Sequence, residues 1–247
     1  MNPKSKTEIE YMRKGGKLLA KILNILKQNS KIGITENELD KMSQELCKEY
    51  AVSPAFFKYK GFPKSLCISV NDKIVHGIAT DRKIKEGDLV SLDFGIIYKG
   101  LYTDAAVSFL VSSKDPKIED FIAATKKSRD EGIKASLENN FVGDISFAMQ
   151  KPILEKGYSI VKELAGHGIG YKLHEDPFIL GYGRPKTGMK LRRNMTIAIE
   201  SMINMGSADI LEENDNWTIR TKDGSLSCHF EHTILITDST PEILTLL

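Results

Sequence analysis

Residues 89–110 read LVSLDFGIIYKGLYTDAAVSFL, two apolar segments separated by the pair Lys99-Gly100. Both segments are rich in β-branched and aromatic residues, and the pair between them is typical of a tight turn. The stretch therefore predicts a β-hairpin. Each strand carries one acidic residue, Asp93 in the first and Asp104 in the second.

The length of the loop decides whether the two acids share a face of the hairpin. With a two-residue loop, Asp93 lies opposite Ala106, and Asp104 points to the same side as Ala106 because side chains alternate along a strand. The two carboxylates are then diagonal neighbours, roughly 7–8 Å apart at Cβ. A three-residue loop would place them on opposite faces. Taken singly, Asp104 also fits a strand end that faces water and Asp93 a β-bulge.

The composition indicates a globular protein without a strong charge. The chain has 247 residues, of which 41% are hydrophobic and 28% charged, and its net charge is +2. That charge is too small to make nucleic acid a main partner, so we expect no DNA binding. The three cysteines form no CxxC pair, which favours reduced thiols in a cytoplasmic protein. The polar N-terminus excludes a signal peptide, and no apolar run approaches the ~20 residues that cross a bilayer, so we expect no membrane partner.

Hydrophobic periodicity and capping signals predict helices and strands on both sides of the hairpin. The first helix contains Gly15-Gly16, which either weakens it or marks a close packing contact. The predicted helices begin at Ser5 or Thr7 and run to about residue 26, then span residues 35–50, 118–138 and 144–157, the last capped by Asp144. The predicted strands span residues 65–70, 73–76, 158–164, 195–203, 218–221 and 228–237.

The polar segment Ser112–Pro116 predicts a seam between two halves, about 1–113 and 114–247, within one domain. Each half contains two helices followed by strands with acids, a weak sign of an ancient duplication. Residues 165–170 read AGHGIG, whose three alternate glycines could suggest a nucleotide-binding loop. However, the spacing is not GxGxxG, and Pro177 prevents a long helix from following directly. We therefore reject a dinucleotide site and expect the glycines to allow close approach of backbone and ligand around His167.

Four acids interrupt apolar strands and have no Lys or Arg within two positions: Asp93, Asp104, Glu200 and Glu231. Three of the five histidines stand beside glycine or in glycine-rich loops, and the other two bracket Glu231. A lone histidine beside glycine is more often structural, and the aromatic cluster at residues 56–62 also fits an ordinary core. Buried acids without a basic partner are usually bound to metal, and four carboxylates with an imidazole suit two divalent ions. This pattern indicates a dinuclear hydrolase.

Several segments strongly resemble the type I methionine aminopeptidases of bacteria. The resemblance extends from the first helix, TEIEYMRKGGKLLA, to the closing EILTLL. The matching segments, in chain order, are KSLCISVNDKIVHGI, GDLVSLDFG, GLYTDAAVSF, AGHGIG, LHEDP, IAIES and EHTILIT.

The resemblance implies a fold and a set of metal ligands. The fold is the α/β (α+β) pita-bread fold, in which two pseudo-symmetric halves surround a curved antiparallel sheet. Asp104 and Glu231 fall on positions that touch both ions. The five metal-ligand positions are Asp93, Asp104, His167, Glu200 and Glu231, and the ions are two divalent metals, Co, Mn, Fe or Zn.

The resemblance also implies catalytic and substrate-binding residues. His76 falls on a position that binds substrate near the leaving peptide, and His174 on one that hydrogen-bonds the scissile amide and the tetrahedral intermediate. Glu200 is similar to the general base of the family. The methionine pocket would contain Phe56, Tyr59, Phe62, Leu173 and Trp217, although Trp217 also fits a turn at the surface or in the core.

The implied activity is removal of the initiator methionine from nascent peptides with a small second residue. The implied partners are nascent peptide N-termini and, transiently, the ribosome, and we expect a monomer. One alternative is a proline-specific pita-bread peptidase, although such enzymes usually carry a large extra N-terminal domain. The other is a non-catalytic homologue that binds nascent chains or the ribosome, although such relatives tend to lose metal ligands.

Four positions depart from the usual family pattern. Ser201 replaces a proline, Asn194 replaces a glycine, Phe56 replaces a smaller residue, and His229 replaces a glutamine. His229 should face the same side as Glu231 and could alter metal preference or substrate reach.

Overall fold

The predicted hairpin forms the centre of the structure, with strand β4 at Leu89–Tyr98 and β5 at Leu101–Leu110. Lys99 and Gly100 both have positive φ, 52° and 80°, as a two-residue turn that matches strand twist requires. The register places Asp93 opposite Ala106, as the two-residue loop predicts. The prediction that the two acids share one face is therefore confirmed.

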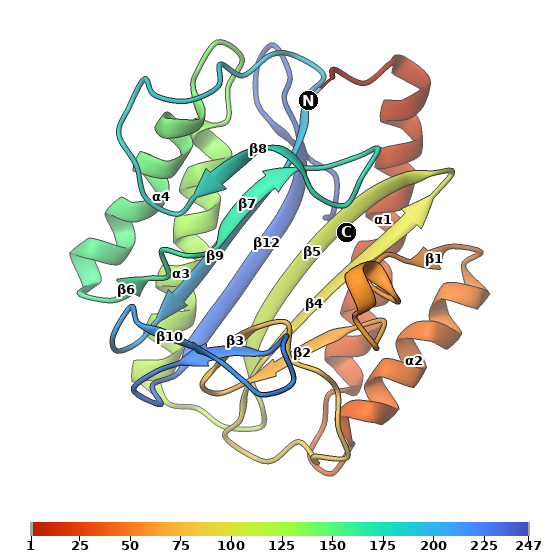
Figure 1. Ribbon diagram of the computed structural model, residues 1–247, viewed down its shortest axis with the longest axis vertical. Helices are drawn as coiled ribbons and strands as arrows, with labels where there is room; N and C mark the ends of the chain where they lie inside the picture. The colour runs from red at the N-terminus through yellow and green to blue at the C-terminus, as the bar shows by residue number, and fades with distance from the viewer. Residues whose placement is uncertain (1, 247) are drawn as a thin grey trace.

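The computed structural model, which describes residues 2–246, extends this hairpin into a ten-stranded antiparallel sheet (Figure 1). Its strand order is β1-β4-β5-β12-β9-β7-β8, with β2 added to β4, β6 to β9 and β13 to β12. A second sheet has the order β10-β11-β3. The other strands are β1 (Ser53–Pro54), β2 (Cys67–Val70), β3 (Lys73–Val75), β6 (Ser159–Ile160), β7 (Ala165–Gly168), β8 (Glu175–Leu180), β9 (Thr196–Asn204), β10 (Ile210–Glu212), β11 (Ile219–Thr221), β12 (Ser227–Leu235) and β13 (Glu242–Ile243).

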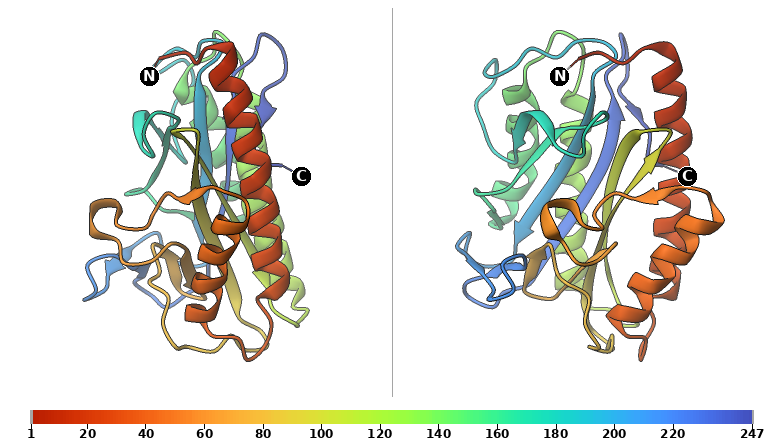
Figure 2. Two further views of the ribbon diagram at one scale, coloured as in Figure 1. Left: turned by 90° about the vertical axis from the view of Figure 1, so that its right-hand side faces the viewer. Right: turned by 45° about the vertical axis from the view of Figure 1, so that its right-hand side comes forward.

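The long helices lie on one face of the large sheet, and the other face carries the second sheet and most of the long loops (Figure 2). Helix α1 packs against β4 and β5, whereas α3 packs against β9 and β12. The apolar cores lie between these helices and the sheet. The helices are α1 (Lys6–Asn29), α2 (Glu36–Glu49), α3 (Pro116–Ala135) and α4 (Val142–Lys156), with a short 3-10 helix η1 at Tyr59–Gly61. Within residues 2–246 no helix is both long and apolar enough to span a bilayer.

The two glycines of α1 mark a close packing contact. Ser5 caps the helix and forms a reciprocal capping box with Glu8. A Cβ at Gly16 would overlap the backbone carbonyl of Leu244, and a Cβ at Gly15 would lie 3.2 Å from Cβ of Tyr98. Glycine has a low helix propensity, but a larger residue at position 16 would not fit, because the helix backbone lies directly against the C-terminal segment.

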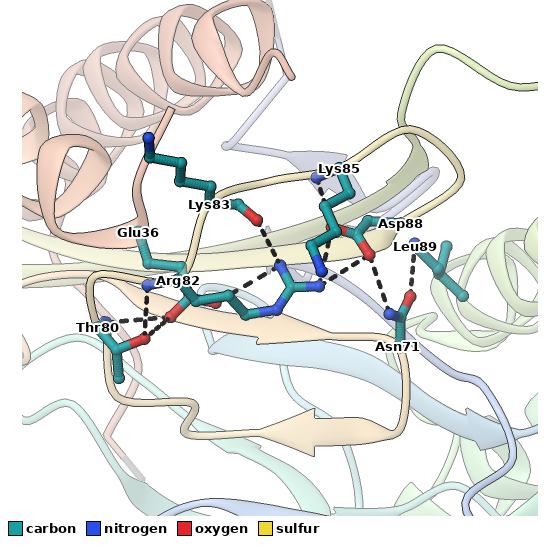
Figure 3. A network of polar contacts seen from close by, with 8 residues as sticks. All are labelled: Glu36, Asn71, Thr80, Arg82, Lys83, Lys85, Asp88 and Leu89. Carbon is teal, nitrogen blue, oxygen red and sulfur yellow. Dashed lines mark hydrogen bonds and ion pairs between the residues drawn. The ribbon is translucent and has the colours of Figure 1, made fainter. Parts of the chain in front are cut away.

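A partly buried polar network fixes the segment between β3 and β4 (Figure 3). The guanidinium of Arg82 donates to both carboxylate oxygens of Asp88, at 2.8 and 2.9 Å. Thr80 donates to Oε2 of Glu36 from both its backbone nitrogen and its hydroxyl, at 3.0 and 2.8 Å. Charge-assisted bonds of this kind are stronger than neutral ones. They hold the segment that follows His76 against the start of α2.

The structure corrects two sequence-based predictions. Asp144 does not precede α4 but lies in its first turn, where its carboxylate accepts a hydrogen bond from the backbone of Phe141. The strand predicted at 158–164 is reduced to Ser159–Ile160, and the glycine-rich stretch after it, predicted as a loop, forms strand β7. Pairing with β8 and β9 on either side outweighs the low strand propensity of glycine.

Candidate metal centre

Three acidic residues form one row across the face of the sheet that lies away from the helices. Asp93 of β4 and Glu231 of β12 both lie opposite Ala106 of β5. Glu231 in turn lies opposite Glu200 of β9. Directly opposite residues of antiparallel strands point to the same face, so the three carboxylates converge.

A second row supplies Asp104 and His167 to the same face. Asp104 is two residues before Ala106 on β5. His167 of β7 lies opposite Ala198, which is two residues before Glu200 on β9. Ligand atoms of Asp104, His167 and Glu231 lie within 4.8 Å of one another. The structure therefore brings together all five residues that the sequence suggested as ligands.

The carboxylates of this group are buried without basic partners. Oδ1 of Asp93 and Oε1 of Glu231 have no hydrogen-bond partner among the described residues. Burial raises the pKa of Asp93 and of Glu231, and repulsion from the neighbouring carboxylates raises each further. Burial, followed by repulsion from Glu200, also raises the pKa of Asp104. Such a concentration of buried acid is costly unless cations accompany it.

Glu200 behaves differently because histidines surround it. Burial alone would raise its pKa, but the hydrogen bond from His229 and the electrostatic effect of the surrounding imidazoles outweigh burial and lower the pKa. Oε1 of Glu200 lies 3.7 Å from Nε2 of His167, which is too long for a hydrogen bond. Two ligands that each lie ~2.1 Å from one cation would be separated by a similar distance.

The tautomer of His167 is the one that a metal ligand needs. Its Nδ1 lies 2.9 Å from the carbonyl oxygen of Gly168. A carbonyl only accepts, so Nδ1 carries the proton and Nε2 presents a lone pair. Histidine ligands in proteins usually donate their second nitrogen in this way. The neighbouring Gly166 allows close approach to the backbone of β9, since a Cβ there would lie 2.5 Å from the carbonyl oxygen of Ala198.

The donor set fits divalent cations. Four carboxylates and one neutral imidazole supply mainly hard oxygen ligands, which suit Mn, Fe or Co better than a thiolate-type zinc site does. The unpartnered buried oxygens of Asp93 and Glu231 are acceptors that a cation would satisfy. The residues present therefore fit the two divalent ions expected from the sequence.

Two further histidines face the same cavity. The rings of His174 and His167 have centroids 4.3 Å apart, and Nδ1 of His174 lies 2.9 Å from the hydroxyl of Tyr59. Burial and the nearby His167 lower the pKa of His174 to about 4. His76 has a left-handed backbone with φ of 57°, and burial lowers its pKa as well. Both imidazoles are thus neutral at pH 7.

An apolar pocket adjoins the carboxylates in a cavity of about 660 Å³. Phe62 and Trp217 meet edge to face with ring centroids 5.1 Å apart. Backbone nitrogens of Trp217 and Thr218 donate to Asp215 and fix the turn that carries the indole, and Trp217 lines the cavity. The five residues that the sequence suggested for a methionine pocket all line this cavity: Phe56, Tyr59, Phe62, Leu173 and Trp217.

The comparison with known families agrees with this geometry. Residues 10–238 match the profile described as metallopeptidase family M24. The chain belongs to metallopeptidase family M24.

This M24 chain is similar to curated methionine aminopeptidases, and the match covers nearly the whole length of both proteins. The methionine aminopeptidase of Clostridium perfringens is 43% identical over 244 residues, which cover 99% of this chain and 98% of the relative. Methionine aminopeptidase 1 of Bacillus subtilis is 38% identical over 242 residues, with 98% of each chain covered. This M24 chain is therefore a metal-dependent hydrolase, and its cofactors are divalent metal ions.

Solved structures of M24 enzymes share the fold. The methionine aminopeptidase of Thermotoga maritima superposes with a TM-score of 0.97 at 40% identity and full coverage of both chains. The prolidase of Pyrococcus furiosus reaches a TM-score of 0.79 at 23% identity, with 99% of this chain and 65% of the prolidase covered. The expected pita-bread fold is confirmed.

Two departures of this M24 chain from its family pattern lie away from the metal-facing side. The hydroxyl of Ser201 donates to Ser128 of α3, which shows that Ser201 points to the helical side of the sheet. Asn194 occupies a turn with φ of 66°, a conformation that asparagine tolerates best after glycine. Phe56 and His229, by contrast, both line the cavity.

Sequence reasoning missed several residues of the M24 cavity. Cys67 of β2 lies opposite Asp93 and lines the cavity, although its sequence suggested only a reduced thiol. The register of β2 against β4 would have revealed it, but no turn fixes that register. Met202, two residues after Glu200 on β9, also lines the cavity. Strand alternation could have predicted it, because residues two positions apart on a strand point to the same face.

Proposed function

We propose that this chain removes the initiator methionine from peptides by metal-dependent hydrolysis and prefers a small second residue. The observation that carries the proposal is that the buried acid and histidine group lines the same cavity as Phe56, Tyr59, Phe62, Leu173 and Trp217. The identity to methionine aminopeptidases over nearly the whole chain supports the same substrate.

We assign five metal ligands in this proposal. When bound, two divalent cations polarise the scissile carbonyl and lower the pKa of a water molecule. Asp93, Asp104, His167, Glu200 and Glu231 would hold them, and Asp104 and Glu231 would serve both cations. Since ligands come from strands on both sides of the β5–β12 pair, correct pairing of these strands is needed before the site exists.

The remaining roles belong to side chains that face the substrate. Glu200, whose pKa is lowered, is an ionised carboxylate that can accept a proton from water and pass it to the leaving amine. His174 donates from Nε2 to the carbonyl oxygen because Tyr59 can donate to its Nδ1. His76 binds the peptide on the leaving side. The pocket of Phe56, Tyr59, Phe62, Leu173 and Trp217 holds the methionine side chain and excludes water.

The organisation and cellular setting complete the proposal. The chain acts as one catalytic domain, with halves at about 1–113 and 114–247. Its partners are nascent peptide N-termini, which implies a transient contact with the ribosome in the cytoplasm. A monomer is sufficient for this activity, since every proposed ligand lies within one chain.

Two other functions are less well supported. A proline-specific peptidase would share the fold, but the prolidase similarity of 23% identity supports the fold alone. A non-catalytic binding protein would not need five ligands on one buried face, together with both accessory histidines.

A peptide assay on metal-stripped protein tests the proposal. Mn, Fe, Co or Zn is added back singly, with Met-Ala-Ser, Met-Leu-Ser, Leu-Ala-Ser and Ala-Pro-Ser as substrates. We expect metal-dependent release of methionine from Met-Ala-Ser, and at least a 10²-fold loss of rate in Glu200→Gln. Cleavage of Ala-Pro-Ser alone would indicate the proline-specific function, and no cleavage by folded, metal-loaded protein would indicate the binding protein.

A further inference from the structure

His229 is a buried histidine beside the metal centre to which the mechanism gives no role. It lies two residues before Glu231 on β12, so its side chain points to the same face, and it is opposite Met202 of β9. Its side chain is 2% exposed and lines the cavity.

The backbone around His229 is held by serines and not by an ordinary ladder bond. The nitrogen of His229 donates to Oγ of Ser108 at 2.9 Å, and that hydroxyl donates to the carbonyl oxygen of His229 at 2.8 Å. Oγ of Ser91 lies 2.6 Å from Oγ of Ser108 and completes the group. These bonds fix the direction in which the imidazole leaves β12.

Within residues 2–246 the imidazole makes one polar contact, with Glu200. Nε2 of His229 lies 3.1 Å from Oε2 of Glu200. A carboxylate that binds a cation is ionised and only accepts, so in the proposed site Nε2 of His229 carries the proton and donates it. The other oxygen, Oε1, is thereby left on the side of His167, whose Nε2 is 3.7 Å away. Glu200 thus lies between two histidines, with Oε2 hydrogen-bonded to His229 and Oε1 beside His167 but not hydrogen-bonded to it.

A role for His229 as a metal ligand fits the contacts less well. Glu200, His229 and Glu231 do offer ligand atoms within 4.8 Å of one another. A coordinating Nε2 would have to lose its proton, and Nδ1 would then be a buried donor. Nδ1 of His229 has no partner among the described residues, whereas Nδ1 of His167 has the carbonyl of Gly168. Ligating histidines almost always have such a partner, and a buried unpaired N–H is costly.

We propose that His229 is a positioning residue that holds Oε2 of Glu200 and so directs Oε1 toward the cation shared with His167. This inference rests on the proposed function, because it assumes that Glu200 is a metal ligand. It predicts that the hydrogen-bond donor, and not the imidazole itself, is what the site needs from residue 229.

Calorimetric titration of metal-stripped protein with Mn²⁺ tests the proposal through a readout other than activity. His229→Leu removes the donor, and we expect it to weaken the binding of one cation by about 10–100-fold, the usual effect of losing such a partner. His229→Gln keeps a donor, and we expect its affinity to remain within a few fold of wild type. His232→Leu is the matched control, since His232 is the next histidine on β12 but bonds Thr245 on the opposite side.

Proton NMR of the Co²⁺-loaded protein separates positioning from coordination. Imidazole N–H signals with a large contact shift, which requires that the ring itself be bonded to Co²⁺, should come from one histidine, His167, in both wild type and His229→Gln. A second such imidazole that disappears in His229→Gln would overturn the positioning role in favour of coordination. Unchanged Mn²⁺ affinity in folded His229→Leu would also overturn it. Failure of wild type to bind any cation would instead contradict the proposed function, and with it this inference.

Discussion

At the scale of single residues, the contact between Tyr59 and His174 is the most informative. The hydroxyl lies 2.9 Å from Nδ1, and the two rings have centroids 5.4 Å apart. Tyr59→Phe keeps the ring in the pocket but removes the partner of Nδ1. We expect kcat for Met-Ala-Ser to fall about 10-fold with KM nearly unchanged, because His174 no longer has a fixed tautomer.

His174→Ala provides the comparison for this prediction. Loss of the whole donor should lower kcat by about 10²–10³-fold, the usual cost of removing one donor to a developing oxyanion. If the Tyr59 hydroxyl keeps the proton of His174 on Nε2, the kcat of Tyr59→Phe should lie between those of wild type and His174→Ala. A kcat for Tyr59→Phe equal to that of wild type would show that the hydroxyl contact has no part in catalysis.

How far single residues can be predicted from sequence depends on whether a local rule fixes their direction. Asp93 and Asp104 follow from strand alternation and a two-residue turn. His76 does not, because its side chain is directed by a left-handed backbone that histidine adopts rarely. The tautomer of His167 depends on a carbonyl whose position only the folded chain defines.

At the scale of elements, helix α1 gives a matched pair of substitutions. Gly16→Ala places a Cβ against the carbonyl of Leu244, so we expect it to destabilise the fold by about 1–3 kcal/mol despite the better helix propensity of alanine. Gly15→Ala meets Cβ of Tyr98 at 3.2 Å, a milder overlap that the gain of about 1 kcal/mol in propensity can offset. Urea denaturation monitored by circular dichroism measures both. Equal stabilities would contradict the packing role of Gly16.

Elements were predictable where periodicity and capping agree, and less so where pairing decides. The capping boxes at Ser5 and Thr35 start helices as expected. Strand β7 is the contrary case, because its sequence, AGHG, has little tendency to form a strand. It becomes one because β8 and β9 pair with it on both sides.

At the scale of the whole molecule, the pairing of β5 with β12 is the feature that local sequence rules could not supply. Glu231 reaches Asp93 and Asp104 only because this pairing joins the strands of the first half of the chain to those of the second. Nothing in either strand specifies the other as its partner. The site was predicted through the pattern of acids and the family resemblance, not through the strand order.

This arrangement couples cation binding to the stability of the whole fold. A cation that binds only the folded chain adds RT ln(1 + [L]/Kd), about 2.7 kcal/mol at 100 times Kd. For a domain of this size that gain corresponds to a rise in Tm of about 5–10 °C. Metal-stripped protein should therefore melt lower than protein supplied with Mn²⁺, and chelator should reverse the gain.

Asp104→Asn distinguishes the contribution of the bound cation to Tm from the stability of the metal-free fold. The amide keeps the shape of the side chain but removes a shared ligand, so we expect the Mn²⁺-dependent rise in Tm to be largely lost. The same change removes one of the mutually repelling buried carboxylates, so the stripped variant should melt at or above stripped wild type. Scanning calorimetry of both proteins, each with chelator and with Mn²⁺, gives the four values required. A variant that keeps the full cation-dependent rise in Tm would show that Asp104 is not a ligand. A metal-stripped variant that melts well below metal-stripped wild type would show that Asp104 stabilises the sheet itself. In that case repulsion among the buried carboxylates does not limit the stability of the fold.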